Sequence, residues 1–155
     1  MARRSKPAPW YHDFRTRLRF EREARKSFST MGCKKVGKGK GAEIVYVVAV
    51  PVPEYEVTRT LTIRLRNRTE PALIDVTVDG PIESPHRYSR ARLCMWPPWA
   101  APEECWTPDE GLLGLIQYAR IHLFREEYWR ETGGLKGGIW AGPEAPHDGP
   151  KEEAA

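Results

Sequence analysis

The stretch IVYVVAVPVPEYEVTRTLTIRLRNRTEPALIDVTV, residues 44–78, decides the fold because it contains three separate strand patterns. The nearly continuous β-branched run over 44–50 is typical of a strand buried on both faces, and Pro51 ends it. Apolar and polar residues alternate over 57–65 and again over 74–79, as they do in strands with one wet face. Three such runs in close succession predict an antiparallel meander.

Two helical patterns flank these strands. Apolar residues recur at helical spacing over 10–28, with arginines between them, which predicts an amphipathic helix. The tetrapeptide Thr-Pro-Asp-Glu at 107–110 is a capping box that predicts the start of a second helix, and Gly133 predicts its end. The residues expected to face inward are Trp10, Phe14, Leu18, Ala24 and Phe28 in the first helix, and Leu112, Leu115, Ile116, Ala119 and Leu123 in the second.

The segment MGCKKVGKGKG, residues 31–41, lies between the first helix and the strands. It holds four Gly and four Lys without periodicity, so we expect a mobile basic loop. Residues 1–40 hold 13 Lys and Arg against 3 Asp and Glu, whereas residues 41–155 hold 12 against 18. A basic front of this kind can approach nucleic acid, an acidic membrane surface or an acidic protein, and it is also the ordinary composition of a solvated helix face.

The length and composition fit one globular domain, with 155 residues of which 40% are hydrophobic and 30% charged. We expect a basic arm over 1–9, a single domain over 10–147 and a disordered tail over 148–155. The longest apolar run, 44–52, is far shorter than the roughly 20 residues that cross a bilayer, and no secretory leader pattern opens the chain. We therefore expect a cytoplasmic protein that does not enter a membrane.

The long irregular stretch 81–108 is where we expect the chemistry, because long loops on a rigid scaffold usually carry function. It holds two of the three cysteines of the chain. Because the total number of cysteines is odd, we expect free thiols. Cys94 is the candidate nucleophile, since it ends an irregular loop directly before Trp-Pro-Pro-Trp, and we expect its sulfur to lie at an open edge of that loop. The alternative is that Cys94 serves only as a small hydrophobic residue buried in the core. Three nearby arginines are expected to favour its thiolate form: Arg87, Arg90 and Arg92.

The spacing around this cysteine resembles the active-site signature of ubiquitin-conjugating enzymes. The tripeptide Ser-Pro-His at 84–86, followed by seven residues and Cys94, is similar to the His-Pro-Asn and catalytic cysteine of that family. Trp-Thr-Pro at 106–108 is similar to the Trp-Ser-Pro that opens the next helix of the family. The resemblance covers residues 10–132. It implies an α+β, ubiquitin-conjugating-enzyme-like fold with an N-terminal helix, an antiparallel meander, a long catalytic loop and a helix packed on the sheet.

A closer resemblance is to the bacterial conjugating-enzyme-like proteins of cyclic-oligonucleotide antiphage signalling (CBASS), on the sequence around Cys94, the Trp- and Glu-rich second helix and the closing stretch 142–147. It implies a cysteine-dependent acyltransferase that takes the C-terminal carboxyl of a cGAS-like nucleotidyltransferase as a thioester. The chain has no glycine-rich phosphate loop after a strand, so we do not expect it to adenylate a carboxyl group itself. This implies either an ATP-dependent activating partner or direct loading from the target protein, and we expect no cofactor in the chain.

Further residues are candidates for roles around Cys94. His86 takes the place of the family's Asn, and we expect it to donate to an oxyanion or to move a proton near neutral pH. The alternative is that His86 has a structural role only, with its hydrogen bonds made to the loop backbone. Ser84 and Tyr88 are expected to support the site, as is His147 if the tail folds back. Cys105 is a candidate redox partner for the nucleophile.

Other functions compete with this reading. A nucleic-acid-binding module would use the basic front and aromatic stacking platforms, but no RNP-like motif or zinc finger is present and we do not expect this partner. A non-catalytic adaptor would keep the fold without the reaction. We expect no metal, because the candidate ligands lack the paired spacing of zinc sites. The aromatic residues concerned are Trp10, Tyr11, Trp96 and Trp99, and the zinc-type residues are His86, Cys94, Cys105, His122 and His147.

Overall fold

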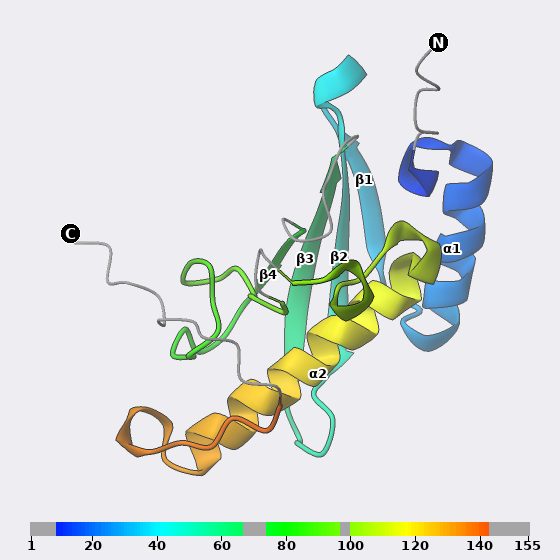
Figure 1. Ribbon diagram of the computed structural model, residues 1–155. Coiled ribbons are helices and arrows are strands. Elements are labelled where there is room, and N and C mark those ends of the chain that lie inside the picture. Colours follow the sequence, from blue (N-terminus) through cyan, green and yellow to red (C-terminus); the bar gives the residue numbers. More distant parts are fainter. Residues whose placement is uncertain (1–8, 67–73, 97–99, 143–155) are drawn as a thin grey trace.

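The computed structural model describes residues 9–66, 74–96 and 100–142, and within them it confirms the predicted α+β class (Figure 1). The helices and strands are α1 (Phe14–Ser27), β1 (Gly32–Val36), β2 (Glu43–Pro51), β3 (Thr58–Arg66), β4 (Asp75–Val78) and α2 (Gly111–Glu131). Short 3₁₀ turns lie at Trp10–His12, Gly39–Gly41, Pro102–Glu104, Pro108–Glu110 and Gly134–Lys136. No helix among the described residues combines the length and apolar character needed to span a membrane.

The four strands form one antiparallel sheet in the order β1-β2-β3-β4, which confirms the predicted meander. In Figure 1, α2 crosses the sheet, α1 lies on the β1 side, and the loop that follows β4 lies on the opposite side of the sheet from α1. The register pairs Tyr46 with Ile63 and Ile63 with Val76, so that apolar side chains of three adjacent strands share one face. This face carries the core.

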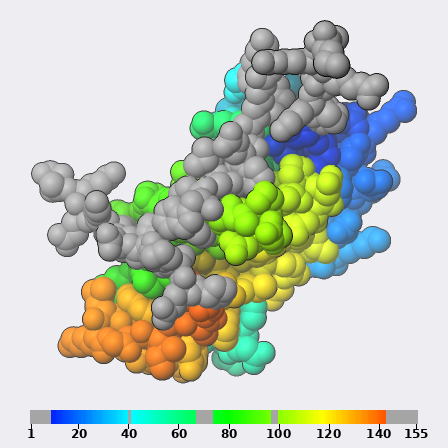
Figure 2. Space-filling view, in the orientation of Figure 1, coloured from blue at the N-terminus to red at the C-terminus, as the bar shows by residue number. Residues whose placement is uncertain are grey.

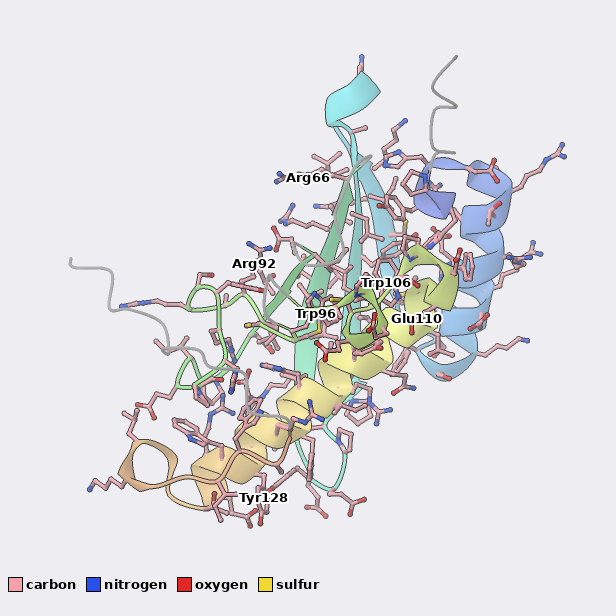
Figure 3. All side chains as sticks on the ribbon, viewed as in Figure 1. Arg66, Arg92, Trp96, Trp106, Glu110 and Tyr128 are labelled. Atoms are coloured by element: carbon pink, nitrogen blue, oxygen red, sulfur yellow. The ribbon has the colours of Figure 1, made fainter. Side chains whose placement is uncertain are left out.

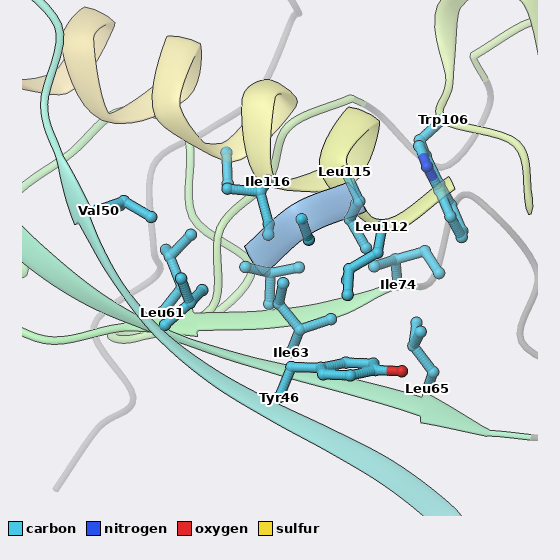
Figure 4. Packing of buried hydrophobic residues seen from close by; sticks show 14 of the residues in the cluster. Tyr46, Val50, Leu61, Ile63, Leu65, Ile74, Trp106, Leu112, Leu115 and Ile116 are labelled. Atoms are coloured by element: carbon cyan, nitrogen blue, oxygen red, sulfur yellow. The ribbon is translucent and has the colours of Figure 1, made fainter. Parts of the chain in front are cut away.

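The core lies between that face of the sheet and α2. Figure 4 shows Leu112, Leu115 and Ile116 of α2 facing Tyr46 and Ile63 of the sheet. All five residues predicted to form the inner stripe of α2 are buried. Burying one such side chain stabilises a fold by about 1.5–3 kcal/mol, so the stripe holds α2, and the loop before it, in a fixed place on the sheet.

The start of α2 follows the predicted capping box. The Thr107 amide donates to the Glu110 carboxylate at 2.9 Å, and a 3₁₀ turn forms over Pro108–Glu110. Gly111 then takes φ 72°, a left-handed conformation that favours glycine, and its carbonyl accepts from the Trp106 indole at 2.8 Å. The helix ends at Glu131, just before Gly133, as predicted.

The segment 31–41 is not a loop throughout, so that prediction was wrong. Gly32–Val36 form β1, which pairs with β2 along its whole length. β1 is an edge strand with exposed side chains, including Lys34 and Lys35, so it needs no apolar alternation and leaves no periodic pattern in the sequence. Lysines on an edge strand also discourage pairing with another chain.

Two predicted burial patterns were also wrong. β2 is not buried on both faces, since Val47 is 41% exposed on the face that points away from α2. Phe14 is 63% exposed instead of facing inward. The predicted helix is interrupted by the turn at Trp10–His12, and α1 begins anew after Asp13, whose carboxylate accepts from the Thr16 amide at 3.1 Å. This restart rotates Phe14 away from the core.

Candidate thiol site

The loop that carries Cys94 is a short hairpin held against β4. The Tyr88 amide donates to the Arg92 carbonyl at 2.9 Å, and the Cys94 amide donates to the His86 carbonyl at 3.2 Å. The second arm of the hairpin continues the sheet, because the Leu93 amide donates to the carbonyl of Val76 in β4 at 2.9 Å. The backbone that leads to the cysteine is therefore held by β4, and the Cys94 amide is held by the facing arm of the hairpin.

The Cys94 thiol is buried, with only 3% of the residue exposed. The expectation that this sulfur lies at an open loop edge was therefore wrong. Its Sγ lies 3.5 Å from the carbonyl oxygen of Trp96, and the Tyr88 hydroxyl donates to the same oxygen at 2.6 Å. Trp96 in turn packs edge-on against Tyr118 of α2, with ring centroids 5.4 Å apart, and Figure 3 shows it beside the start of that helix.

The surroundings of the thiol act on its pKa in opposite directions. Burial raises the pKa of Cys94, whereas a hydrogen bond from Tyr88 and the positive charge of Arg92 lower it, and burial is the largest effect. Burial and the neighbouring sulfur also raise the pKa of Tyr88. Both groups are therefore neutral near pH 7. Arg92, whose guanidinium carbon lies 4.9 Å from the centre of the Tyr88 ring, acts as the sequence predicted, but its effect is outweighed.

His86 fixes the cysteine through its backbone, and its ring is covered. The Ser84 hydroxyl accepts from the His86 amide at 3.1 Å, which closes a local turn. The buried imidazole lies against Trp140, with ring centroids 4.2 Å apart. Trp140 also contacts His122 of α2 at 5.3 Å between centroids. Sequence reasoning missed Trp140 because it comes from a segment beyond α2 that carries no motif.

The segment after α2 turns back along the helix. The Ile139 amide donates to the Thr132 hydroxyl at 2.7 Å, and Arg125 donates from Nε to the Ala141 carbonyl at 3.0 Å. Figure 2 shows this C-terminal segment, in orange, on the surface against α2. These two bonds place Trp140 over His86.

Arg87 does not act on the thiol as predicted, because its charge is neutralised by a buried carboxylate. Its Nε and Nη2 lie 2.8 and 2.6 Å from the two carboxylate oxygens of Glu126, and the pair is 1% and 0% exposed. Arg130 and His122 contact the same carboxylate at 2.7 and 3.0 Å. Burial acts to raise the pKa of Glu126, but hydrogen bonds from His122 and Arg87 lower it to about 2.

Sequence reasoning also missed Glu126, although a weak pattern was present. His122, Glu126 and Arg130 are four residues apart and therefore share one face of α2. This face is polar in sequence and therefore carries no apolar signal of burial. The loop covers this face, because Arg87 reaches Glu126 across 39 residues of sequence.

The remaining candidate residues are Cys105 and His147. Cys105 is buried and its Sγ lies 3.9 Å from the Ala100 carbonyl. Cys94 and Cys105 are both free thiols. His147 lies outside the described residues. Over 9–66, 74–96 and 100–142 no three His, Cys, Asp or Glu side chains gather as metal ligands.

The aromatic residues of the nucleic-acid hypothesis are placed in the core. Trp10, Tyr11 and Trp96 are buried, so none of these three presents a ring face for base stacking, and Trp99 lies outside the described residues. The basic side of the molecule is exposed at several positions of α1 and β1: Arg15, Arg19, Arg22, Lys26, Lys34 and Lys35.

The described site combines a buried thiol, a tyrosine hydroxyl that shares the Trp96 carbonyl oxygen with it, and a hairpin fixed to α2 by a buried ion pair. In comparisons with protein-family models, with curated proteins and with solved structures, the chain matches none of them.

Proposed function

We propose that the chain is a ubiquitin-conjugating-enzyme-like acyl carrier whose Cys94 thiol accepts a carboxyl group of a partner protein as a thioester. The observation that supports this most is the position of the thiol beside Tyr88 and Arg92. The Tyr88 hydroxyl and the thiol both reach the Trp96 carbonyl oxygen, at 2.6 and 3.5 Å, and both neighbours act to lower the pKa of Cys94 against the effect of burial. A thiol that served only to fill the core would need neither. The resemblance of 84–94 to the family signature supports the same assignment.

The chemistry proceeds by two acyl transfers. Cys94 loses its proton, and the thiolate attacks the carbonyl carbon of an activated carboxyl group, so that a C–S bond forms and the activating group leaves with its electron pair. An amine then attacks the thioester, the C–S bond breaks, and the thiolate is regenerated. In the closed site the Tyr88 hydroxyl donates its hydrogen to the Trp96 carbonyl. When that hydrogen bond is broken, the same hydroxyl can donate to the Cys94 thiolate instead.

His86 is the proposed donor to the oxyanion that forms in each transfer. Its ring is covered by Trp140, so this role requires the C-terminal segment to move aside. The backbone role of His86 is already met, because its carbonyl holds the Cys94 amide. The two roles use different atoms of one residue and are compatible.

Burial of the thiol sets a condition on this reaction. At 3% exposure Cys94 cannot meet the end of an extended peptide, so the loop must open before the acyl group arrives. Loops that open locally at small free-energy cost are common at sites that must admit a substrate. We propose that docking of the partner supplies this opening.

The proposed acyl donor is the C-terminal carboxyl of a cGAS-like nucleotidyltransferase, activated by an ATP-dependent enzyme, in bacterial antiphage signalling. This assignment rests on the resemblance to CBASS-associated conjugating-enzyme-like proteins. The product would be a nucleotidyltransferase held on, or transferred from, Cys94, which would regulate its signalling activity.

A second candidate is a non-catalytic adaptor with the same fold. The burial of Cys94, which raises its pKa, favours this candidate. In that case the thiol is a small core residue, and binding of a partner does not depend on it.

One experiment distinguishes the acyl carrier from the adaptor. The chain is incubated with the nucleotidyltransferase, the activating enzyme and ATP, and the products are analysed by electrophoresis with and without a thiol reductant. We expect a reductant-sensitive adduct with the wild-type chain and with Cys105→Ala, a matched buried cysteine, and none with Cys94→Ala. Partner binding without an adduct in any chain would support the adaptor and contradict the carrier.

A further inference from the structure

The loop that carries Cys94 is fastened to α2 by charged groups that the acyl-transfer chemistry does not use. Glu126 is the centre of this cluster, which we call the Glu126 clamp and which consists of Glu126, Arg87 and Arg130. Both arginines also bind backbone carbonyls of the loop. Arg87 donates to the carbonyls of Pro81 at 3.2 Å and Arg90 at 2.6 Å, and Arg130 donates to those of Pro81 at 3.3 Å and Glu83 at 3.0 Å.

The clamp is connected to the cysteine by the backbone of the hairpin. Arg87 pairs with Leu93 in an antiparallel bridge, and its neighbour His86 accepts the hydrogen bond of the Cys94 amide at 3.2 Å. A shift of Arg87 therefore moves the two backbone contacts that hold the cysteine.

The clamp is also anchored on the sheet. Arg130 donates to Glu127 at 3.0 Å, and Glu127 accepts from Arg59 of β3 at 2.8 Å. A continuous chain of charged contacts thus runs from β3 across α2 to the loop. The loop position is set relative to the whole scaffold, not only to one helix.

We propose that Glu126 is a positioning residue for Cys94: it holds the loop 81–94 on α2 through Arg87 and Arg130, and it keeps the thiol closed until the loop is released. The catalytic consequence rests on the proposed acyl-carrier function, whereas the effect on access to the thiol does not.

Replacing Glu126 by Gln removes the charge that both arginines share and leaves Arg87 buried without a carboxylate. Loss of a buried charged partner shifts a local opening equilibrium by roughly ten- to hundredfold. We expect the loop to open more often, so that Cys94 reacts faster with a small alkylating reagent while it is held less well for acyl transfer. A role confined to global stability would not change the alkylation rate of the folded protein.

The matched control is Glu21→Gln. Glu21 is a second buried glutamate, on α1, that contacts Arg17 at 3.1 Å, Arg25 at 3.4 Å and the Tyr46 hydroxyl at 2.9 Å. It resembles Glu126 in burial and in having two arginine partners, and it has no described contact with the loop. Replacing Glu21 should lower the stability of the fold without changing the alkylation rate of Cys94.

The experiment measures iodoacetamide alkylation of Cys94 by peptide-level mass spectrometry, at a temperature where circular dichroism shows every variant to be folded. We expect Glu126→Gln to raise the rate at least about tenfold and to move the pH–rate profile to lower pH, because the burial that raises the pKa of Cys94 is relieved. Glu126→Asp, which keeps the charge, should restore part of the wild-type rate, and Glu21→Gln should match wild type.

If Glu126→Gln does not fold, a second variant still tests the positioning role. Arg130→Gln removes one partner at the partly exposed edge of the clamp and should give a smaller rise in the same direction. Wild-type alkylation rates in the folded clamp variants would overturn the positioning role even if thioester forms normally. Faster alkylation in a chain whose wild type never forms a thioester would retain the positioning role and overturn only the proposed function.

Discussion

The proposed chemistry depends on Cys94. The reactivity of its thiol is set by a balance between burial, which raises the pKa, and two contacts that lower it. Burial raises its pKa, and the hydrogen bond from Tyr88 partly offsets this effect. A thiolate in so enclosed a site is expected to form at higher pH than that of an exposed cysteine.

Removing the Tyr88 hydroxyl tests this balance. In Tyr88→Phe the hydrogen bond that lowers the pKa of Cys94 is lost, so the pKa should rise further and alkylation at pH 8 should slow by about three- to tenfold. The measurement is the pH–rate profile of iodoacetamide labelling, with Tyr55→Phe, whose hydroxyl contacts Glu131 instead, as the control. Equal or faster labelling of Tyr88→Phe would show that the hydroxyl does not assist the thiolate.

Glu126 should make the stability of the fold depend on acid pH. Its pKa in the folded chain is about 2, below the ordinary 4.5, so the ionised carboxylate stabilises the fold above pH 4.5 and this contribution is lost as the pH falls towards 2. The shift corresponds to on the order of 3 kcal/mol at neutral pH. Urea unfolding should show wild type more stable than Glu126→Gln at pH 7 and the gap reduced to about a quarter at pH 2.5. A gap of equal size at both pH values would be the contrary result.

At the scale of elements, the sequence predicted those parts whose residues interact locally. The capping box at 107–110 and the inner stripe of α2 lie within one helix, and the alternation in β3 and β4 lies within single strands. β1 was missed because its position comes from pairing with β2 and not from its own side chains. Phe14 was misplaced because one backbone turn before it resets the helical phase.

The inner face of α2 should dominate the stability of the molecule. Leu115 is fully buried, and Leu115→Ala should lower the free energy of unfolding by about 2–5 kcal/mol. Ile121, on the exposed side of the same helix, serves as the control, since surface truncations usually change stability by about 0.5 kcal/mol or less. Chemical denaturation measures both. Similar losses for the two variants would mean that α2 does not pack as described.

The segment after α2 should shield His86. Trp140→Ala removes the ring that lies against the imidazole, so modification of His86 by diethylpyrocarbonate should become several-fold faster. Leu135→Ala, in the same segment but strongly exposed, should leave the rate unchanged. Peptide mapping assigns the modified histidine. Unchanged modification in Trp140→Ala would show that the segment does not cover the site.

At the scale of the whole molecule, the candidate site is built from parts that are distant in sequence. The spacing of 84–86 and Cys94 identified the loop, and Tyr88 was included as a supporting residue. Glu126 and Trp140 were not, because a contact between a loop and a later helix leaves no periodic pattern in either. The burial of the thiol was likewise unpredictable, since it results from packing between the loop, β4 and α2.

The central claim is that Cys94 carries an acyl group, and intact-mass spectrometry of the chain tests it most directly. After incubation with the nucleotidyltransferase, the activating enzyme and ATP, we expect a species whose mass is the sum of the two chains less one water. Hydroxylamine should remove it, and Cys94→Ala should not form it. Absence of this species from wild type, or its persistence in Cys94→Ala, would contradict the claim.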